Sequence, residues 1–134
     1  MTEPQVLLAP VQQYLAAPRC AVLSTISPSG FPHQAVVHYV PEPDAVLING
    51  DVGRRWARNL QRDPRVSMVV HDAEDVLHWV GIRGEVVTTR EGRDAVADAM
   101  AMARRYAEDP ADYEGRERLS LLIRPQRVFE YGGG

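Results

Sequence analysis

The chain has 134 residues, a formal net charge of -3 and a sequence pI of about 5.8. Its 15 basic side chains are all arginine, so the sequence contains no lysine. This excludes a pyridoxal-phosphate Schiff base, a P-loop lysine and a lysine general base. Any bound anion must be held by arginine, by backbone N–H groups or by neutral donors. Arginine suits phosphates and carboxylates, because it stays protonated and presents a planar fork of donors.

Length and composition, with 45% hydrophobic and 25% charged residues, indicate a single globular domain over residues 1–134. The acidic balance argues against a nucleic-acid partner. No apolar stretch reaches the roughly 18 residues that a membrane span needs, and the N-terminus lacks the basic cluster of a signal peptide. The lone Cys20 allows no internal disulfide, and its apolar neighbours predict a buried, unreactive thiol. We therefore expect a cytoplasmic protein.

The N-terminal segment favours a helix over residues 5–17, because apolar residues recur near helical spacing and Pro18 closes the segment. Two β-branched segments, 19–27 and 31–40, flank a Pro-Ser-Gly turn and predict a hairpin. A second turn, rich in proline, leads into a third strand at residues 45–49.

A glycine-containing loop then precedes a short helix at residues 54–61 and a strand at 66–71. The next strand, at residues 76–89, is long and contains Gly81 and Gly84, which is typical of bulges or barrel corners.

The longest predicted helix covers residues 91–108, with Thr88 and Glu91 at capping-box spacing. The apolar stripe expected to face the core consists of Val96, Met100, Ala103 and Tyr106 or Ala107. Two strands close the chain, at residues 119–123 and 128–131, with a break at the intervening proline.

Strands that are neighbours in sequence are joined mostly by short turns, so they should pair antiparallel. A parallel sheet is disfavoured, because most strand pairs lack a crossover helix. The sequence therefore predicts a mostly β, α+β fold: a closed or partly closed antiparallel barrel of six or seven strands with peripheral helices.

The histidines do not form a metal pattern. His33 and His38 are five residues apart on one predicted strand, which places them on opposite faces. His71 and His78 flank an acidic turn without zinc-ligand spacing. We predict no metal site, and no serine lies in the G-x-S-x-G frame of a serine hydrolase.

Residues 50–60 (GDVGRRWARNL) are the most informative segment. A predicted strand enters a glycine loop, and an arginine-rich helix leaves it. Free N–H groups and the dipole at a helix N-terminus attract anions, and arginines in the first turn add charged donors. Arg54 and Arg58 are four residues apart and share a face. From these residues, a phosphate site and a solvated basic face are equally consistent.

Four motifs occur in order: a hairpin with a Gly-x-Pro turn at 21–33, RRWARNLQRDPRVS at 54–67, HWVGIRGEV at 78–86, and RVFEYG at 127–132. Together they resemble the pyridoxamine 5'-phosphate oxidase-like, FMN-binding split β-barrel family, and within it the branch that uses the deazaflavin coenzyme F420. The resemblance covers nearly the whole chain and implies a six- to seven-stranded antiparallel split β-barrel with peripheral helices.

The resemblance implies a homodimer with two cofactor sites at the subunit interface. The implied activity is hydride transfer between F420, or alternatively FMN, and an unknown small molecule. A non-catalytic flavin- or haem-binding protein of the same fold is the competing interpretation. No catalytic residue is assigned, although Tyr39, His38 and His78 are candidates for protonating a reduced substrate.

Carried over by position, the implied cofactor contacts come from the second strand, the end of the third strand, the arginine helix and one aromatic residue. They are Gln34, Ala35, Val36, Val37, Asn49, Gly50, Asp51, Arg54, Arg55, Trp56, Arg58, Asn59 and Trp79.

Trp56 stands where the family usually has a phosphate-binding lysine. Either Arg54 or Arg55 takes over the anion, or the cofactor binds differently. Trp56 itself either stacks on the ligand or anchors the helix into the barrel or dimer interface. We expect alanine at Arg55 or Arg58 to weaken cofactor binding, and lysine at Trp56 to strengthen it. The chain also lacks the extended C-terminal substrate segment of true pyridoxamine-phosphate oxidases, which argues against synthesis of pyridoxal phosphate.

Overall fold

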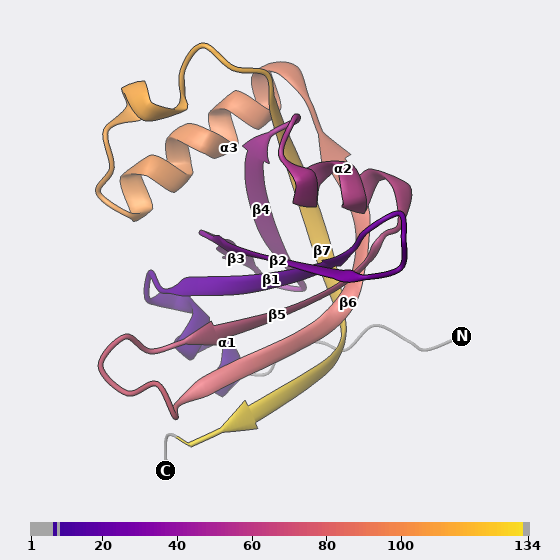
Figure 1. Cartoon of the computed structure of the whole chain (residues 1–134). Helices are drawn as coiled ribbons and strands as arrows, with labels where there is room; N and C mark the ends of the chain where they lie inside the picture. Colours follow the sequence, from indigo (N-terminus) through magenta and orange to yellow (C-terminus); the bar gives the residue numbers. More distant parts are fainter. Residues whose placement is uncertain (1–6, 8, 133–134) are drawn as a thin grey trace.

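The computed structural model describes residues 7 and 9–132 (Figure 1). Its strands are β1 (Cys20–Ile26), β2 (Pro32–Val37), β3 (Val40–Glu42), β4 (Ala45–Asp51), β5 (Arg65–His71), β6 (Trp79–Arg90) and β7 (Arg118–Tyr131). Its helices are α1 (Ala9–Ala16), α2 (Arg55–Arg62), α3 (Gly92–Arg105) and the short 3-10 helix η1 (Pro110–Tyr113).

The seven strands form one curled sheet in the order β2-β1-β5-β6-β7-β4-β3, and every neighbouring pair is antiparallel. The helices lie around this half-barrel, with α3 and α2 on either side of β4 and α1 near the opposite end (Figure 1). The predicted mostly β, α+β split barrel with antiparallel strands and peripheral helices is confirmed.

The curl depends on the two long strands β6 and β7, which pair antiparallel although α3 and η1 separate them in sequence. The first half of β6 pairs with β5, whereas the first half of β7 pairs with β4, so this strand pair joins the two halves of the sheet. Its register shifts at Gly84, where an added Cβ would collide with the backbone carbonyl of Arg124. A glycine is therefore needed for the strands to approach this closely at the bend.

The predicted break between two C-terminal strands is wrong, because β7 runs continuously through Pro125. Pro125 lies opposite Gly84, at the register shift. A proline removes one ladder hydrogen bond, and a bulge is a place where the sheet tolerates that loss.

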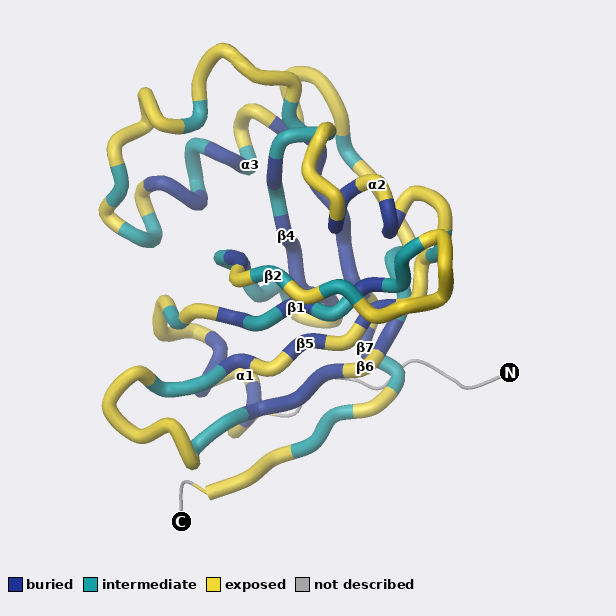
Figure 2. Tube along the Cα trace, in the orientation of Figure 1, coloured by how far each residue is buried: buried dark blue, intermediate teal, exposed yellow. Residues whose placement is uncertain are grey.

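The core lies inside the curl, and β4 with the first part of β7 is its most buried portion (Figure 2). Helix α1 adds Val11, Tyr14 and Leu15 to this core. Tyr39 is fully buried, and its hydroxyl donates to the carbonyl oxygens of Leu15 at 3.1 Å and Ala17 at 3.0 Å. Tyr39 thus joins α1 to the barrel, a structural role, and is no proton donor to a ligand.

The predicted core-facing stripe of α3 is right at Ala103, which is buried, and at Tyr106, which packs against the core, but it is wrong at Val96. Its buried residues are Ala95, Ala99, Met102 and Ala103, whereas Val96 is 46% exposed. The alanines let the helix lie close to the sheet, and that close packing outweighs the larger apolar area of valine. The predicted capping box is also absent, because α3 begins at Gly92 with no side-chain cap.

Other boundaries differ by a few residues. The short edge strand β3 occupies part of the predicted proline turn, since Pro41 is tolerated at a sheet edge. Strand β6 begins at Trp79, after residues 76–78. Of the predicted N-terminal helix, residues 5, 6 and 8 lie outside the described residues. Cys20 is exposed, contrary to prediction, because it faces outward at the start of β1.

Helix α2 is fixed to the barrel by two buried side chains. Trp56 is only 7% exposed and packs against Gly50 of β4. Asn59 is buried and donates from Nδ2 to Oγ1 of Thr25 at 3.0 Å. Trp56 therefore anchors the helix into the barrel core, one of the two roles expected for it. A lysine there would empty this core position, which removes the reason to expect stronger cofactor binding from that change.

The contact between Gly50 and Trp56 can be tested by Gly50→Ala. The new Cβ would lie 2.5 Å from Cζ2 and 2.8 Å from Cη2 of Trp56. Overpacking of this kind typically costs about 1–3 kcal/mol, so we expect the free energy of unfolding, measured in urea, to fall by that amount. Gly53→Ala is the control, because its Cβ would meet only Asp51 Oδ1 at 3.4 Å. Equal stability of the two variants would contradict the proposed anchoring.

Candidate functional site

A cleft of about 530 Å³ lies between β2, the end of β4, the start of α2 and the segment that follows α3. We call it the main cleft. Strand β2 is one edge of the sheet and β4 lies next to the other edge, so the two meet here because the sheet curls. The cleft is therefore a product of the half-barrel and of the helices that flank β4.

Most of the sequence-predicted cofactor residues line the main cleft. They are Ala35, Val36 and Val37 on β2, Asn49, Gly50 and Asp51 on β4, and Arg54, Arg55 and Trp56 at the start of α2.

Two predicted residues close to this group do not line the main cleft. Gln34 donates from Nε2 to Oγ of Ser24 at 3.4 Å, across the β1–β2 pair. Asn59 is buried beneath α2, in the contact with Thr25 described above.

Arg58 and Trp79 lie in other hollows. Arg58 lines a hollow of about 330 Å³ on α2, together with Arg62 and with Arg55, which it shares with the main cleft. Trp79 lines a third hollow of about 200 Å³, where its ring stacks on Tyr131 with centroids 5.7 Å apart. Within one chain the structure does not bring Trp79 to the main cleft.

Sequence reasoning did not predict the remaining lining residues as cofactor contacts, although it named His38 as a candidate for protonating a reduced substrate. They are His33, His38, Met102, Glu108, Asp112, Tyr113 and Arg118. Arg118 lies in the cleft because β7 pairs with β4 and places it opposite Asp51. This pairing joins segments far apart in the sequence, so no local sequence pattern predicts it. His33 and His38 were expected on opposite faces, but β2 ends at Val37, so the strand alternation stops before His38.

The arginine end of the cleft contains guanidinium groups of two kinds. Arg118 is held in place, since its Nε and Nη2 donate to Asn49 Oδ1 at 3.0 and 2.8 Å. Burial lowers the pKa of Arg118, which nevertheless stays a cation at ordinary pH. Arg54 and Arg55 are exposed, and their side chains make no hydrogen bond or ion pair with any residue that the structure describes. These two side chains are available for an anion.

The backbone at the start of α2 also favours the binding of an anion. Helix α2 begins after Arg54 with no side-chain cap, so its first N–H groups remain free for an anionic partner. Asp51 does not compete for the two free arginines at close range. Its carboxylate accepts from Gly53 N at 2.8 Å and from Arg116 at 3.2 Å, and the Gly53 N–H in particular lowers the pKa of Asp51.

Beside Arg118, whose guanidinium carbon lies 5.0 Å from the centre of the Tyr113 ring, the cleft holds a hydrogen-bonded group of three side chains. His38 Nδ1 lies 3.1 Å from Oε1 of Glu108, and the Tyr113 hydroxyl donates to the same oxygen. Burial, and next the bond to Glu108, raise the pKa of Tyr113 to about 12, so the phenol keeps its proton. The His38 ring also stacks on Tyr106, with centroids 3.8 Å apart and planes 5° apart.

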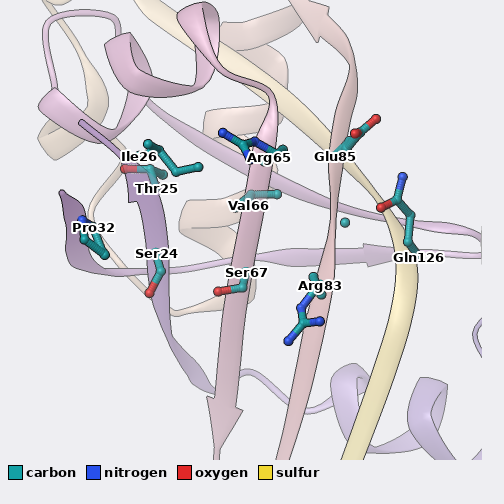
Figure 3. A pocket seen from close by; sticks show the side chains of 11 residues that line it. Ser24, Thr25, Ile26, Pro32, Arg65, Val66, Ser67, Arg83, Glu85 and Gln126 are labelled. Atoms are coloured by element: carbon teal, nitrogen blue, oxygen red, sulfur yellow. The ribbon is translucent and has the colours of Figure 1, made fainter. Parts of the chain in front are cut away.

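A groove of about 350 Å³ lies elsewhere, along β1, β5 and β6 (Figure 3). Ser24, Ser67 and Arg83 present side chains to it from three adjacent strands (Figure 3). Arg65, at its rim, is already paired with Asp63 at 2.8 Å. This groove shares no lining residue with the main cleft, and it contains none of the predicted cofactor contacts.

Within residues 7 and 9–132, no three His, Cys, Asp or Glu side chains gather as a group able to hold a metal ion. None of the helices in this part of the chain has the length and apolar character needed to span a bilayer.

Solved structures with the same fold carry different functions. An F420 reductase is 23% identical, with a TM-score of 0.77 over 88% of this chain and 94% of that one. A conserved hypothetical protein, Rv2991 from Mycobacterium tuberculosis, is 21% identical, with a TM-score of 0.74 over 98% and 89%. The heme storage protein HutZ from Vibrio cholerae is 18% identical, with a TM-score of 0.72 over 97% and 98%. At these identities the likeness concerns the fold.

The family is identified by a different comparison. The family model described as pyridoxamine 5'-phosphate oxidase matches residues 7–132. This range includes the whole curled sheet, all three α-helices and every residue of the main cleft. The chain therefore belongs to the pyridoxamine 5'-phosphate oxidase family.

Proposed function

We propose that the main cleft binds coenzyme F420 and that the protein is an F420-dependent oxidoreductase, which transfers a hydride to a small-molecule substrate. The observation that carries the proposal is the pair of free guanidinium groups, Arg54 and Arg55, at the uncapped start of α2. Unpaired arginines beside free helix N–H groups form a donor set suited to phosphate.

The other walls of the cleft fit a flavin-like ligand. Ala35 and Val37 present small or apolar side chains from β2, and a flat ring needs such a surface. Arg55 also lines the neighbouring hollow with Arg58 and Arg62. A ligand whose acidic tail extends past its phosphate would meet further positive charge there. That feature favours F420, which carries glutamates beyond its phosphate, over FMN.

Trp56 does not exclude this ligand. Its ring belongs to the core beneath the cleft, and the loss of the family's usual lysine is offset by Arg54 and Arg55, the two exposed arginines that directly precede it. When bound, the cofactor supplies the hydride chemistry. The residues of the chain bind the anionic groups, present an apolar wall to the ring and limit the access of water.

A homodimer is the second part of the proposal. Val36, Val22 and Val69 lie opposite one another on β2, β1 and β5, so their side chains form an apolar row on one face of the sheet. Val36 is 71% and Val69 is 38% exposed. Because Val36 also lines the main cleft, a second copy packed on this row would help to close the cleft. Trp79 would reach a cofactor only from such a second copy.

Binding can be tested by titrating purified protein with F420 and with FMN, followed by fluorescence. We expect F420 to bind with a Kd below about 10 μM, in the range typical of cofactor sites. Arg55→Ala should weaken this affinity by roughly 10-fold or more, because a hydrogen bond to a charged group contributes about 1.5–3 kcal/mol. Arg93→Ala, which removes an exposed arginine outside the cleft, is the charge-matched control. If neither cofactor binds at tens of micromolar, the proposal fails.

The dimer has its own test in Val69→Glu. A carboxylate in the apolar row would be desolvated on association, which is costly for an unpaired charge. We therefore expect wild-type protein to sediment as a dimer and the variant as a monomer of 14.9 kDa. Val96→Glu, on the exposed face of α3, should leave the dimer intact. A monomeric wild type at tens of micromolar would contradict this assembly.

Haem binding is a second candidate function, favoured by the imidazole groups of the cleft. His38 is available as an axial ligand, because its Nδ1 is held by a carboxylate, an arrangement common among metal-ligating histidines. The cleft arginines would pair with the propionates. Adding haem should then produce a shifted Soret band that His38→Ala abolishes. A Soret shift without any binding of F420 or FMN would establish this function in place of the first.

A further inference from the structure

We propose that Arg118 is an anion-binding residue of the main cleft, and that Asn49 and Asp98 are the residues that position it. This inference rests on the proposed function for the identity of its ligand, since it assigns a further, preorganised guanidinium group to the anionic part of that cofactor. It is carried by an unbroken series of hydrogen bonds that runs from Arg118 through β4 and β7 to helix α3.

Arg118 differs from the two free arginines at the start of α2, because its side chain is fixed before any ligand binds. Nε and Nη2 both donate to Oδ1 of Asn49, at 3.0 and 2.8 Å, and the guanidinium carbon lies 5.0 Å from the centre of the Tyr113 ring. Nη1 donates to no residue that the structure describes. Since Arg118 lines the main cleft, its remaining N–H groups are available to a ligand there.

The amide of Asn49 has no hydrogen-bonding capacity left for a ligand. An asparagine side chain offers two hydrogens to donate and two acceptor lone pairs. Nδ2 donates to the carbonyl oxygen of Ala95 and to Oγ of Ser120, both at 2.8 Å, while Oδ1 accepts twice from Arg118. Asn49 is one of the predicted cofactor contacts and lines the cleft. Its polar atoms, however, can act on a ligand only through Arg118.

Asp98, on α3, fixes the far end of the series. Ser120 is fully buried, and its hydroxyl donates to Oδ2 of Asp98 at 2.7 Å, because a carboxylate can only accept. Oγ of Ser120 is therefore an acceptor for Asn49, which requires Nδ2 to face Ser120 and leaves Oδ1 to face Arg118. Every bond in the series is thus donated in one direction, from the cation to the carboxylate. Hydrogen bonds aligned in this way polarise and strengthen one another.

An ion pair at the surface completes the support of Asp98. Nη1 of Arg90 donates to both carboxylate oxygens of Asp98 at 3.2 Å, and Nη2 of Arg90 lies 3.6 Å from Oε2 of Glu42. Glu42 joins the series only through Arg90, at its outermost end. Truncation of Glu42 therefore removes a carboxylate next to the same arginine without interrupting the bonds that lead to Arg118.

The charges around Arg118 favour an anion at this place. Arg118 forms no ion pair with any carboxylate in the part of the chain that the structure describes, and the nearby Asp51 is paired with Arg116. Burial lowers the pKa of Arg118 most, and the charge of Arg54 lowers it further. An anion bound between the two guanidinium groups offsets both effects. Because Arg118 is already ordered, it also loses less conformational entropy on binding than the exposed Arg54 and Arg55.

The first experiment is a double-mutant cycle on the affinity for F420, measured by fluorescence. We expect Arg118→Ala to raise Kd by about tenfold or more, as for loss of a hydrogen bond to a charged group. Asp98→Ala should raise Kd by about threefold or more, but should have no further effect in the Arg118→Ala background. Glu42→Ala is the matched control and should bind as wild type does. Asp98→Asn keeps the shape of the side chain and replaces Asp98→Ala if that variant does not fold.

A second measurement needs no cofactor and detects the fixed side chain directly. In protein labelled with ¹⁵N-arginine, Nε–H of Arg118 should have an order parameter above about 0.6, the value below which a group counts as flexible. It should fall below that value in Asp98→Ala and in Ser120→Ala, which removes only the hydroxyl in the middle of the series. Inorganic phosphate should shift this signal in wild type, whereas sodium chloride at equal ionic strength should not.

The possible results separate the two proposals. Unchanged F420 affinity in Arg118→Ala would overturn the binding role of Arg118. An equal effect of Asp98→Ala with and without Arg118, or a flexible Arg118 side chain in wild type, would overturn the positioning role. If wild-type protein binds no F420, the proposed function fails and the phosphate titration alone decides this inference. A shifted Arg118 signal then supports it, and an unshifted signal overturns it.

Discussion

The close approach of β6 and β7 at Gly84 is the constraint on which the other features depend. Without a side chain at Gly84, the β7 backbone can lie against β6, and the strand pair bends at its register shift. The bend lets the first half of β6 pair with β5 while the first half of β7 pairs with β4. The two edges of the curled sheet therefore lie close to each other. The main cleft exists because β2, from one edge, and β4, from next to the other edge, then line the same space.

The start of α2 shows how structure and binding are combined in one turn of helix. Trp56 points into the barrel and packs on Gly50, whereas Arg54 and Arg55 point outward and stay unpaired. Strand β4, which forms part of the cleft wall, therefore also fixes the position of the arginines through the contact between Gly50 and Trp56. A rigid anchor below the charged residues limits the entropy that they lose when an anion binds.

The order of strands and helices could be predicted from the sequence, because alternation, turn residues and helix breakers are local signals. The face of α3 could not, since the choice of Ala95 and Ala99 over Val96 depends on how closely the helix approaches the sheet. Much of the cleft also depends on contacts between distant segments. Arg118 is placed by pairing of β7 with β4, and Glu108 by the path of the chain after α3.

The arginine-only composition has a consequence for how the main cleft responds to its surroundings. A guanidinium holds its proton beyond any physiological pH, whereas an ammonium group in a partly desolvated site can lose it. The positive potential at the start of α2 is therefore constant across the pH range in which proteins work. It is also beyond the reach of the acyl transfer reactions that neutralise lysine side chains. Any change in ligand affinity with pH must then originate in the ligand, or in the histidines and carboxyl groups of the cleft.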